Sequence, residues 1–295
     1  MNETSTTNRP TVSRETLALT IVTMLAFAAN PLLCRLALGA AHIDAASFAT
    51  LRIISGAAML SLIVLPRWRG RGRPAADWRS VTMLFTYMVF FSFAYLSLSV
   101  GTGALILFGA VLLTMFVVAL VKGEKFSLSS WTGLVTATLG LVYLVSPGVT
   151  APDPLGAVMM AVAGIAWGFY SLLGRAAGDP LGDTANNFLF CVPLAIATSM
   201  FFIGDLHASW QGVLLAVASG AIASGLGYAM WYAALAGLTA TRAATVQLSV
   251  PVIAAFGGVV LLSEPVTFRL LLASAATLGG IAVVLAQRNP RKPAS

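Results

Sequence analysis

Long apolar stretches, separated by short polar segments, run along almost the whole chain. Proline, glycine and charged residues mark the segments between them, as is typical of turns and loops. Each stretch is about 20 residues long, and a helix that rises about 1.5 Å per residue then crosses a hydrocarbon core about 30 Å thick. The predicted fold class is therefore all-α, a polytopic membrane protein of ten transmembrane helices. They are expected at about residues 17–38, 45–65, 79–99, 101–121, 128–146, 154–175, 184–203, 210–235, 241–262 and 267–286.

A repeat divides these helices into two halves. The same 140 positions separate Arg35 from Arg175 and Glu124 from Glu264, and the apolar segments around them align without gaps. Each copy holds five spans, an odd number, so the second copy lies upside down in the membrane. Inverted repeats are typical of secondary transporters, which bind substrate near the midplane between the repeats. We expect two inverted five-helix repeats around a central cavity, over residues 1–147 and 152–288, and a cytoplasmic tail over 289–295.

The composition excludes an ordinary soluble protein. Apolar residues make up 58% of the chain and charged residues 9%, whereas soluble domains carry about 25% charged residues. The net charge of +7 is explained by Lys and Arg in cytoplasmic loops, and no nucleic acid partner is expected. Placing both termini in the cytoplasm leaves Arg35 and Arg269 near outer helix ends. We expect a multi-pass protein of the bacterial inner membrane, surrounded by the lipid bilayer.

The inversion places related charges at opposite ends of the molecule. Glu124 and Arg175 would face the cytoplasm, while Glu264 and Arg35 would face outside. We hypothesise that Arg35 with Glu264 forms an outer gate or clamp, and that Arg175 with Glu124 forms the related inner one. The alternative is that each charge is simply solvated at a helix end.

Several short motifs, one of them at matching places in the two copies, resemble a known family. They are a small residue followed by Glu at 123–124 and 263–264, the Gln-Leu-Ser-Val-Pro run at 247–251, and Arg52 in the second span. Over about residues 15–288 the chain is similar to the EamA-type drug/metabolite transporters, and most similar to their YddG branch. The family resemblance implies a twice-repeated exporter whose fifth and tenth helices pack outside a central cavity. The branch implies aromatic and other hydrophobic amino acids as substrates.

Prolines interrupt three of the spans: Pro31 the first, Pro193 the seventh and Pro251 the ninth. Each lacks a backbone N–H and frees the carbonyl four residues earlier, so a helix kink is expected there. In lipid a freed carbonyl must face protein or a water-filled cavity. Asn30 and Gln247, polar residues close to two of these prolines, are candidates to bind a substrate amino group. The alternative for both is a packing kink with an interhelical hydrogen bond.

Arg52 is the one cation clearly inside a span, in the outer half of the second helix. An arginine within a membrane segment usually faces the interior of the bundle. It could bind a substrate carboxylate with two parallel hydrogen bonds. The alternatives are that it binds helix-end carbonyls or extends its head group toward the membrane surface.

Aromatic residues recur at helical spacing on two spans, with Tyr87 and Phe91 on the third and Trp167 and Tyr170 on the sixth. Such rings can line a cavity, stack on an apolar substrate and offer a hydrogen bond. The alternative is an aromatic belt at the membrane surface. Tyr87, Trp167 and Tyr170 lie deep in their spans, which favours the cavity.

Other candidates lie closer to the cytoplasmic side. Tyr228, Trp231 and Tyr232 are near that end of the eighth span, so a belt or a gate is the favoured interpretation. Asn186 and Asn187 are near the expected start of the seventh span, where a helix cap is favoured over a cytoplasmic entrance.

Several kinds of chemistry have no motif in this sequence. No Asp, Glu, His or Lys lies in the middle of a span, whereas proton-coupled pumps usually carry buried titratable relays. Facilitated export or exchange is therefore favoured, with Glu124 or Glu264 as candidates if protons are used. The sequence contains no P-loop, no acidic metal cluster and no nucleophile–base pair, so we expect no enzyme activity, metal or cofactor.

Together these patterns predict an inner-membrane secondary transporter that exports amino acids by alternating access, with aromatic and other hydrophobic ones favoured. Its expected partner is this small-molecule substrate, and a monomer is the favoured oligomeric state. The alternative in the same superfamily is a drug or other metabolite exporter. An intramembrane enzyme and a structural membrane protein are the alternatives from other classes.

Overall fold

The computed structural model describes residues 13–71, 75–148, 150–174 and 178–286. Helices dominate these ranges, with one isolated β-bridge between Ile43 and Ala208. All ten predicted spans are present there, the eighth as three consecutive helices and the ninth as two. The elements are α1 (Arg14–Gly39), α2 (Ala45–Arg71), α3 (Trp78–Ala94), α4 (Val100–Val121), α5 (Leu128–Val145), α6 (Pro154–Gly174), α7 (Pro180–Phe201), η1 (Ile203–Asp205), α8 (Trp210–Val217), η2 (Ala218–Leu226), α9 (Gly227–Leu235), α10 (Ala240–Gln247), α11 (Ser249–Leu262) and α12 (Phe268–Ala286).

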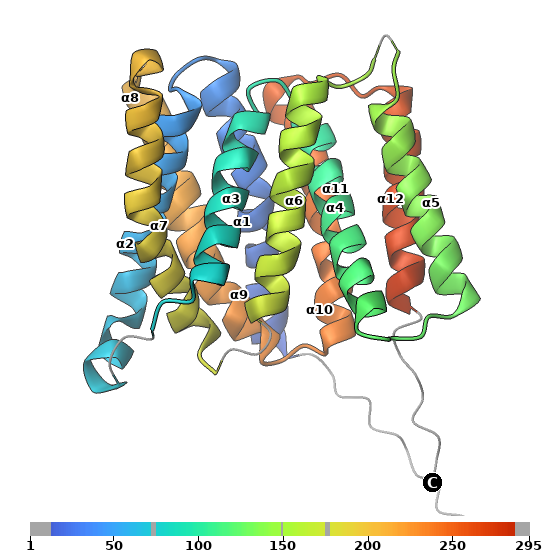
Figure 1. The fold of residues 1–295 in the computed structure, drawn as a ribbon, viewed down its shortest axis with the longest axis horizontal. Helices are drawn as coiled ribbons and strands as arrows, with labels where there is room; N and C mark the ends of the chain where they lie inside the picture. The colour runs from blue at the N-terminus through green and yellow to red at the C-terminus, as the bar shows by residue number, and fades with distance from the viewer. Residues whose placement is uncertain (1–12, 72–74, 149, 175–177, 287–295) are drawn as a thin grey trace, which may run out of the picture.

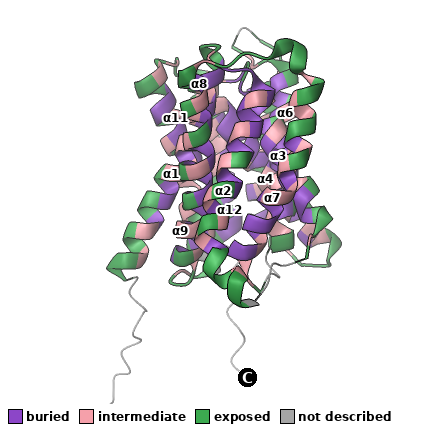
Figure 2. Cartoon of the chain, turned by 90° about the vertical axis from the view of Figure 1, so that its left-hand side faces the viewer, coloured by how far each residue is buried: buried purple, intermediate pink, exposed green. Residues whose placement is uncertain are grey.

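The helices run up and down in one bundle, with α5 and α12 paired at one side (Figure 1). The upper end in that view carries the α1–α2, α3–α4 and α11–α12 connections. The lower end carries the start of α1 and the end of α12. Large apolar side chains such as Leu62, Val121 and Phe256 are exposed on the outside of the bundle, while the buried positions lie inside it (Figure 2). This distribution suits a protein surrounded by lipid, where apolar surface needs no cover.

The two ends of the bundle differ in charge. Arg269 lies at the upper end, where its Nη1 donates to the carbonyls of Leu144 and Ser146 at the end of α5. A cation at a helix C-terminus is favourable because the last carbonyls carry partial negative charge. Arg35 also belongs to the upper end. The lower end holds the other described basic residues that flank the helices: Arg14, Arg67, Arg69, Arg79, Lys122, Lys125 and Arg242.

The contact between α5 and α12 has the symmetry expected of an inverted repeat. A Cβ added to Gly133 would lie 2.7 Å from the Gly280 carbonyl oxygen, and one added to Gly140 would lie 3.0 Å from the Ala273 carbonyl oxygen. At the repeat offset of 140 positions, Gly133 corresponds to Ala273 and Gly140 corresponds to Gly280. The two contacts are therefore equivalent under the repeat. Small residues let the two backbones approach closely without a side chain between them. The predicted pair of inverted repeats is confirmed in this interface, with α5 and α12 packed together outside the other helices (Figure 1).

The third span is shorter than predicted. The apolar pattern extends to residue 99, but α3 ends at Ala94 and a tight turn follows it. The Ser99 side chain then accepts a hydrogen bond from the Thr102 N–H and caps α4. A capping serine starts a new helix by satisfying an N–H that has no partner within that helix. The residues between Ala94 and Ser99 therefore form the connection, although their side chains are apolar enough to continue the span.

The eighth and ninth spans are interrupted in different ways. In the eighth, η2 is a nine-residue π-helix between α8 and α9. In the ninth, α10 ends at Gln247 and α11 begins at Ser249, so the expected disturbance near Pro251 occurs as a break at Leu248. By contrast, α1 and α7 continue through Pro31 and Pro193. π-Helical turns are rare and occur often at functional sites.

Candidate substrate site

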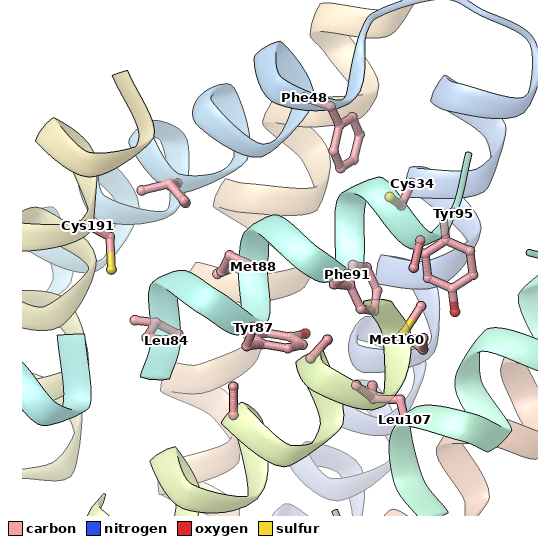
Figure 3. Packing of buried hydrophobic residues seen from close by; sticks show 14 of the residues in the cluster. Cys34, Phe48, Leu84, Tyr87, Met88, Phe91, Tyr95, Leu107, Met160 and Cys191 are labelled. Atoms are coloured by element: carbon pink, nitrogen blue, oxygen red, sulfur yellow. The ribbon is translucent and has the colours of Figure 1, made fainter. Parts of the chain in front are cut away.

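Aromatic rings from neighbouring helices meet in the centre of the bundle. Tyr87 on α3 lies 4.7 Å from Trp167 on α6 between ring centres, and 5.5 Å from Phe91 on its own helix. Tyr170 lies 5.5 Å from Trp167, one turn along α6. Figure 3 shows Tyr87 and Phe91 side by side on α3 within the buried core. The structure thus brings together the four aromatic residues that the sequence predicted for a cavity.

Two further rings, one from each repeat, extend this aromatic cluster. Tyr228 on α9 lies 5.9 Å from Trp167, and Phe27 on α1 lies 5.6 Å from Tyr228. Tyr228 is 6% exposed and Trp231 7% exposed. The interpretation of these two residues as a surface belt is therefore wrong, because they pack inward and a belt residue would face the interface. Phe27 aligns with Trp167 across the repeat, a signal in the sequence that could have placed it here.

Arg52 lies beside the aromatic cluster, and it heads the fully buried side chains by volume, at 1% exposed. Its Nη2 donates to the Tyr87 hydroxyl at 3.2 Å. The guanidinium carbon is 4.7 Å from the centre of the Phe91 ring and 5.6 Å from that of Tyr87. A cation over an aromatic face is attracted by the negative face of the ring. Arg52 therefore points into the bundle, and the interpretation that it extends toward the membrane surface is wrong.

Asn30 is buried and joined to the π-helical segment of the eighth span. Its Oδ1 accepts hydrogen bonds from the Ser219 hydroxyl at 2.8 Å and the Ser224 hydroxyl at 3.3 Å. Gly220 lies between these serines, and a Cβ on it would collide with the Arg52 carbonyl on α2. The π-helical turn therefore lets η2 approach α1 and α2 closely while presenting both hydroxyls to Asn30. Sequence reasoning missed these serines, because their pairing depends on a helix type that has no clear sequence signal.

The lower side of the aromatic cluster is polar. The Tyr170 hydroxyl donates to Thr184 Oγ1 at 3.3 Å and accepts from Asn187 Nδ2 at 3.5 Å. Thr184 also shares a hydrogen bond of 2.9 Å with the Tyr232 hydroxyl. The prediction that Asn187 caps the seventh span is wrong, because α7 begins earlier, at Pro180, and Asp179 caps it. Asn187 instead lies inside the helix and joins α7 to α6.

The remaining polar candidate, Gln247, is not brought to these rings by any contact found among the described residues. It is the last residue of α10 and is half-buried, next to the break at Leu248. Its neighbour Val246 packs against the buried residues around Trp231 and Ala28. Gln247 therefore lies at the break in the ninth span, where α10 ends and α11 has not yet begun.

At the upper end, Arg35 and Glu264 form the ion pair that the repeat predicted, with 3.6 Å between Nε and Oε1. Arg35 Nη1 also donates to the carbonyls of Tyr95 and Leu96, both at 3.1 Å, in the turn after α3. The two carboxylate oxygens of Glu264 accept from the Val100 N–H at 2.9 and 3.1 Å, at the start of α4. This upper clamp, formed by Arg35, Glu264 and the Val100 N–H, therefore joins α1, α4 and the α11–α12 connection.

The backbone at Ser263 directs Glu264 into this position. Ser263 has a φ of 53° at the end of α11, and the N–H groups of Ser263 and Glu264 both donate to the Gly258 carbonyl. Its repeat partner Gly123 has a φ of 82° at the end of α4. Glu124, which follows Gly123, is exposed, and Arg175 lies outside the described residues. Both copies thus end with a left-handed residue, a common way to stop a helix.

Glu264 lies in the α11–α12 connection, and burial raises the pKa of its carboxyl group above the usual range. The hydrogen bond from Val100 and the charge of Arg35 act in the opposite direction without cancelling that effect. A raised pKa means that the buried site favours the protonated acid more than water does.

Two pockets lie away from the aromatic cluster. One, of about 690 Å³, lies between α4, α5 and α6 and has an almost entirely apolar lining. The other, of about 340 Å³, lies at the upper end between the α1–α2 connection and the end of α7, and includes Asp44 and His207. Within the described ranges, no group of three or more His, Cys, Asp or Glu side chains is placed to hold a metal ion.

Comparison with known proteins agrees with this architecture. The model of the EamA-like transporter family matches residues 154–286. An uncharacterized protein of Pseudomonas aeruginosa is 49% identical over 94% of this chain and 97% of its own length, and an uncharacterized transporter of Archaeoglobus fulgidus is 25% identical over 82% and 89%. A solved crystal structure at 20% identity aligns over 96% of this chain and 100% of that chain with a TM-score of 0.63, a likeness of fold alone. The chain is thus a multi-pass membrane protein and belongs to the EamA-like transporter family.

Proposed function

We propose that this protein exports amino acids across the bacterial inner membrane, with aromatic and other hydrophobic side chains favoured. The observation that carries the proposal is the position of Trp167, whose ring lies among those of Tyr87, Tyr170 and Tyr228. These rings come from both repeats, and inverted-repeat transporters bind substrate at the interface between repeats. Aromatic faces stack on apolar or aromatic side chains, while hydroxyl groups orient the polar part of a ligand.

The proposed binding residues divide into two kinds. Tyr87, Phe91, Trp167 and Tyr170 would stack on the substrate side chain. Arg52 would bind its carboxylate, because Tyr87 holds the guanidinium at the edge of the same cluster. Asn30 and Gln247 are the proposed polar contacts for the rest of the substrate, the former held by two serines and the latter at a helix break.

Transport by alternating access requires one end of the bundle to close while the other opens. We propose that the upper clamp is the outer gate, since it joins α1 and α4 of the first repeat to Glu264 of the second. Glu124 and Arg175 would form the repeat-related inner gate. The five-helix units 1–147 and 152–288 would rock against each other, with small residues at their contacts. Because the acids of the described chain lie outside the middle of the helices, we favour facilitated export or exchange without covalent chemistry.

Purified protein in liposomes tests the proposal directly. Counterflow of phenylalanine, tryptophan, leucine and alanine should show preference for the aromatic and larger apolar substrates, with or without a pH gradient. Trp167→Ala should remove that preference, and Trp210→Ala, at an exposed position on α8, should retain it. Unchanged selectivity in Trp167→Ala would overturn the proposed role of the rings. Strict dependence on a proton gradient would overturn uncoupled transport.

Export of cationic drugs is the alternative within the same superfamily. The buried charge of Arg52 opposes it, since a cation beside the Tyr87 and Phe91 rings would meet a guanidinium already there. Saturable counterflow of a lipophilic cation, with no effect of any amino acid, would favour this alternative.

A further inference from the structure

The buried guanidinium of Arg52 has hydrogen-bonding capacity that the protein does not use. Its Nε and Nη1 are buried and have no hydrogen-bond partner, while Nη2 donates to Tyr87. Arginine keeps its charge in protein interiors and carries five N–H donors on two edges of a planar group. Unpartnered buried donors are costly, and native structures rarely tolerate them without a functional reason. Two donor nitrogens of Arg52, with three N–H groups between them, therefore have no protein partner and can donate to a ligand.

No protein carboxylate neutralises this charge in the part of the chain that the structure describes. The described residues form two ion pairs, Arg35 with Glu264 and Arg67 with Asp179, and both lie at the ends of the bundle. The acids in that part lie in connections or in the first turn of a helix. The aromatic faces of Tyr87 and Phe91 stabilise the cation in part but carry no net charge. The site thus holds one uncompensated positive charge.

A bound ligand also meets few free acceptors for an ammonium group. Asn30 Oδ1, an acceptor that the sequence analysis proposed for the substrate, already accepts from two serine hydroxyls. The Tyr87 oxygen accepts from Arg52. An ammonium group placed there would be repelled by the guanidinium and would give up its hydration in exchange for few acceptors. The arrangement therefore suits a carboxylate far better than it suits an amine.

We infer that this site takes, besides the proposed amino acid substrates, a second substrate class, the aromatic monocarboxylate of net charge −1, and binds it more tightly than the zwitterionic amino acid of the same skeleton. The inference rests on the proposed transport function and specifies its charge requirement. A monocarboxylate neutralises Arg52 and gives acceptors to its unpartnered N–H groups, while its ring stacks in the aromatic cluster. A zwitterion makes the same carboxylate contact but leaves the site with its net positive charge. Burying an unneutralised charge is the more costly arrangement.

Three probes that share one skeleton test this inference: 3-phenylpropanoate, phenylalanine, which adds an ammonium group, and phenethylamine, which lacks the carboxylate. Binding to the purified protein in detergent, measured by calorimetry, avoids the membrane leak of weak acids. We expect 3-phenylpropanoate to bind at least about tenfold more tightly than phenylalanine, because only the monoanion neutralises the site. Phenethylamine should show no saturable binding.

Two variants connect the preference to Arg52. Arg52→Gln should lose the binding of 3-phenylpropanoate, while Arg52→Lys, which keeps the charge but loses the planar fork, should bind with intermediate affinity. Arg52→Gln should also raise the melting temperature without ligand, since it removes an unneutralised buried charge. An arginine needed only for packing would give the opposite shift.

The outcomes separate this inference from the proposed function. Tighter binding of phenylalanine than of 3-phenylpropanoate, or equal binding, would overturn the inference and leave amino acid export standing. Binding of neither aromatic acid would overturn both. The ranking of the three probes on the wild-type protein decides the matter even if an Arg52 variant fails to fold.

Discussion

Removing the Glu264 side chain is the sharpest test of the upper clamp. The Val100 N–H donates to the two carboxylate oxygens of Glu264 at 2.9 and 3.1 Å, and Glu264→Ala removes both acceptors. Leaving such a group without a partner costs about 1–3 kcal/mol. Losing the ion pair with Arg35, 3.6 Å long and partly exposed, adds at most about 1 kcal/mol. We expect a loss of about 2 kcal/mol from the closed upper end, which is about 30-fold in its equilibrium constant.

Glu264→Gln is the matched control. Glutamine keeps an amide oxygen that can accept from Val100 and removes only the charge. Because burial already raises the pKa of Glu264, the closed upper end disfavours that charge, and its loss should cost little. We expect the closed state of this variant to remain within about threefold of wild type, less than 1 kcal/mol.

Cys34 provides the assay. It is fully buried on α1, next to Arg35, and lies close to Phe91 and Tyr95 beneath the upper clamp (Figure 3). In a Cys191→Ser background it is the remaining thiol, and a membrane-impermeant maleimide applied from the upper side reports opening of that end. Labelling should be about 30-fold faster in Glu264→Ala and within about threefold of wild type in Glu264→Gln. Equal rates in the two variants would refute the argument from the Val100 hydrogen bonds, and equal rates in all three proteins would refute the gate.

Three further predictions concern pH and packing. Since burial raises the pKa of Glu264, protonation of this carboxyl group stabilises the closed upper end at low pH, and the contribution is lost as the pH rises through the raised pKa. Labelling of Cys34 in the wild type, relative to Glu264→Gln, should therefore slow on acidification. A relative rate that increases on acidification would contradict this direction. Gly280→Val should lower thermal stability by about 2 kcal/mol, because the new side chain would overlap the α5 backbone. Gly279→Val is the control and should have no such effect, since a side chain there meets open space. Equal melting temperatures of the two variants would contradict the close contact between α5 and α12. Gly123→Ala should lower the free energy of unfolding by about 1 kcal/mol, because Gly123 has a φ of 82° that alanine adopts only with strain. Gly70→Ala, inside α2 with open space around it, should be neutral or stabilising. A neutral effect of Gly123→Ala would contradict the need for a left-handed residue there.

The upper clamp was within reach of sequence reasoning. Arg35 and Glu264 stand out because each has a repeat partner 140 positions away, and the inversion places both at the same end. Their side chains meet at 3.6 Å as predicted. What the sequence could not supply is the second role of Glu264 at Val100, which depends on the left-handed turn at Ser263 and on where α4 begins.

The aromatic cluster was predicted in part. Tyr87, Phe91, Trp167 and Tyr170 were recognised from their depth and helical spacing. For Tyr228 the sequence favours a membrane-surface belt or a gate, because distance along a regular helix places it near the lower end, and burial excludes only the belt. The structure buries it against Trp167 and Phe27, since inward rotation of a side chain, and not depth alone, decides whether a ring reaches the core.

The sequence by itself determined the number of spans, their inverted repeat and their membrane setting. The physical reason is that lipid requires about 20 apolar residues per crossing and internal hydrogen bonding along each helix, both local properties. Only the tertiary structure decided that η2 is π-helical, that Asn187 lies within a helix and that Arg52 is buried with two unpartnered nitrogens. These features depend on how helices far apart in sequence rotate and approach, because neighbouring backbones decide which side chains find partners.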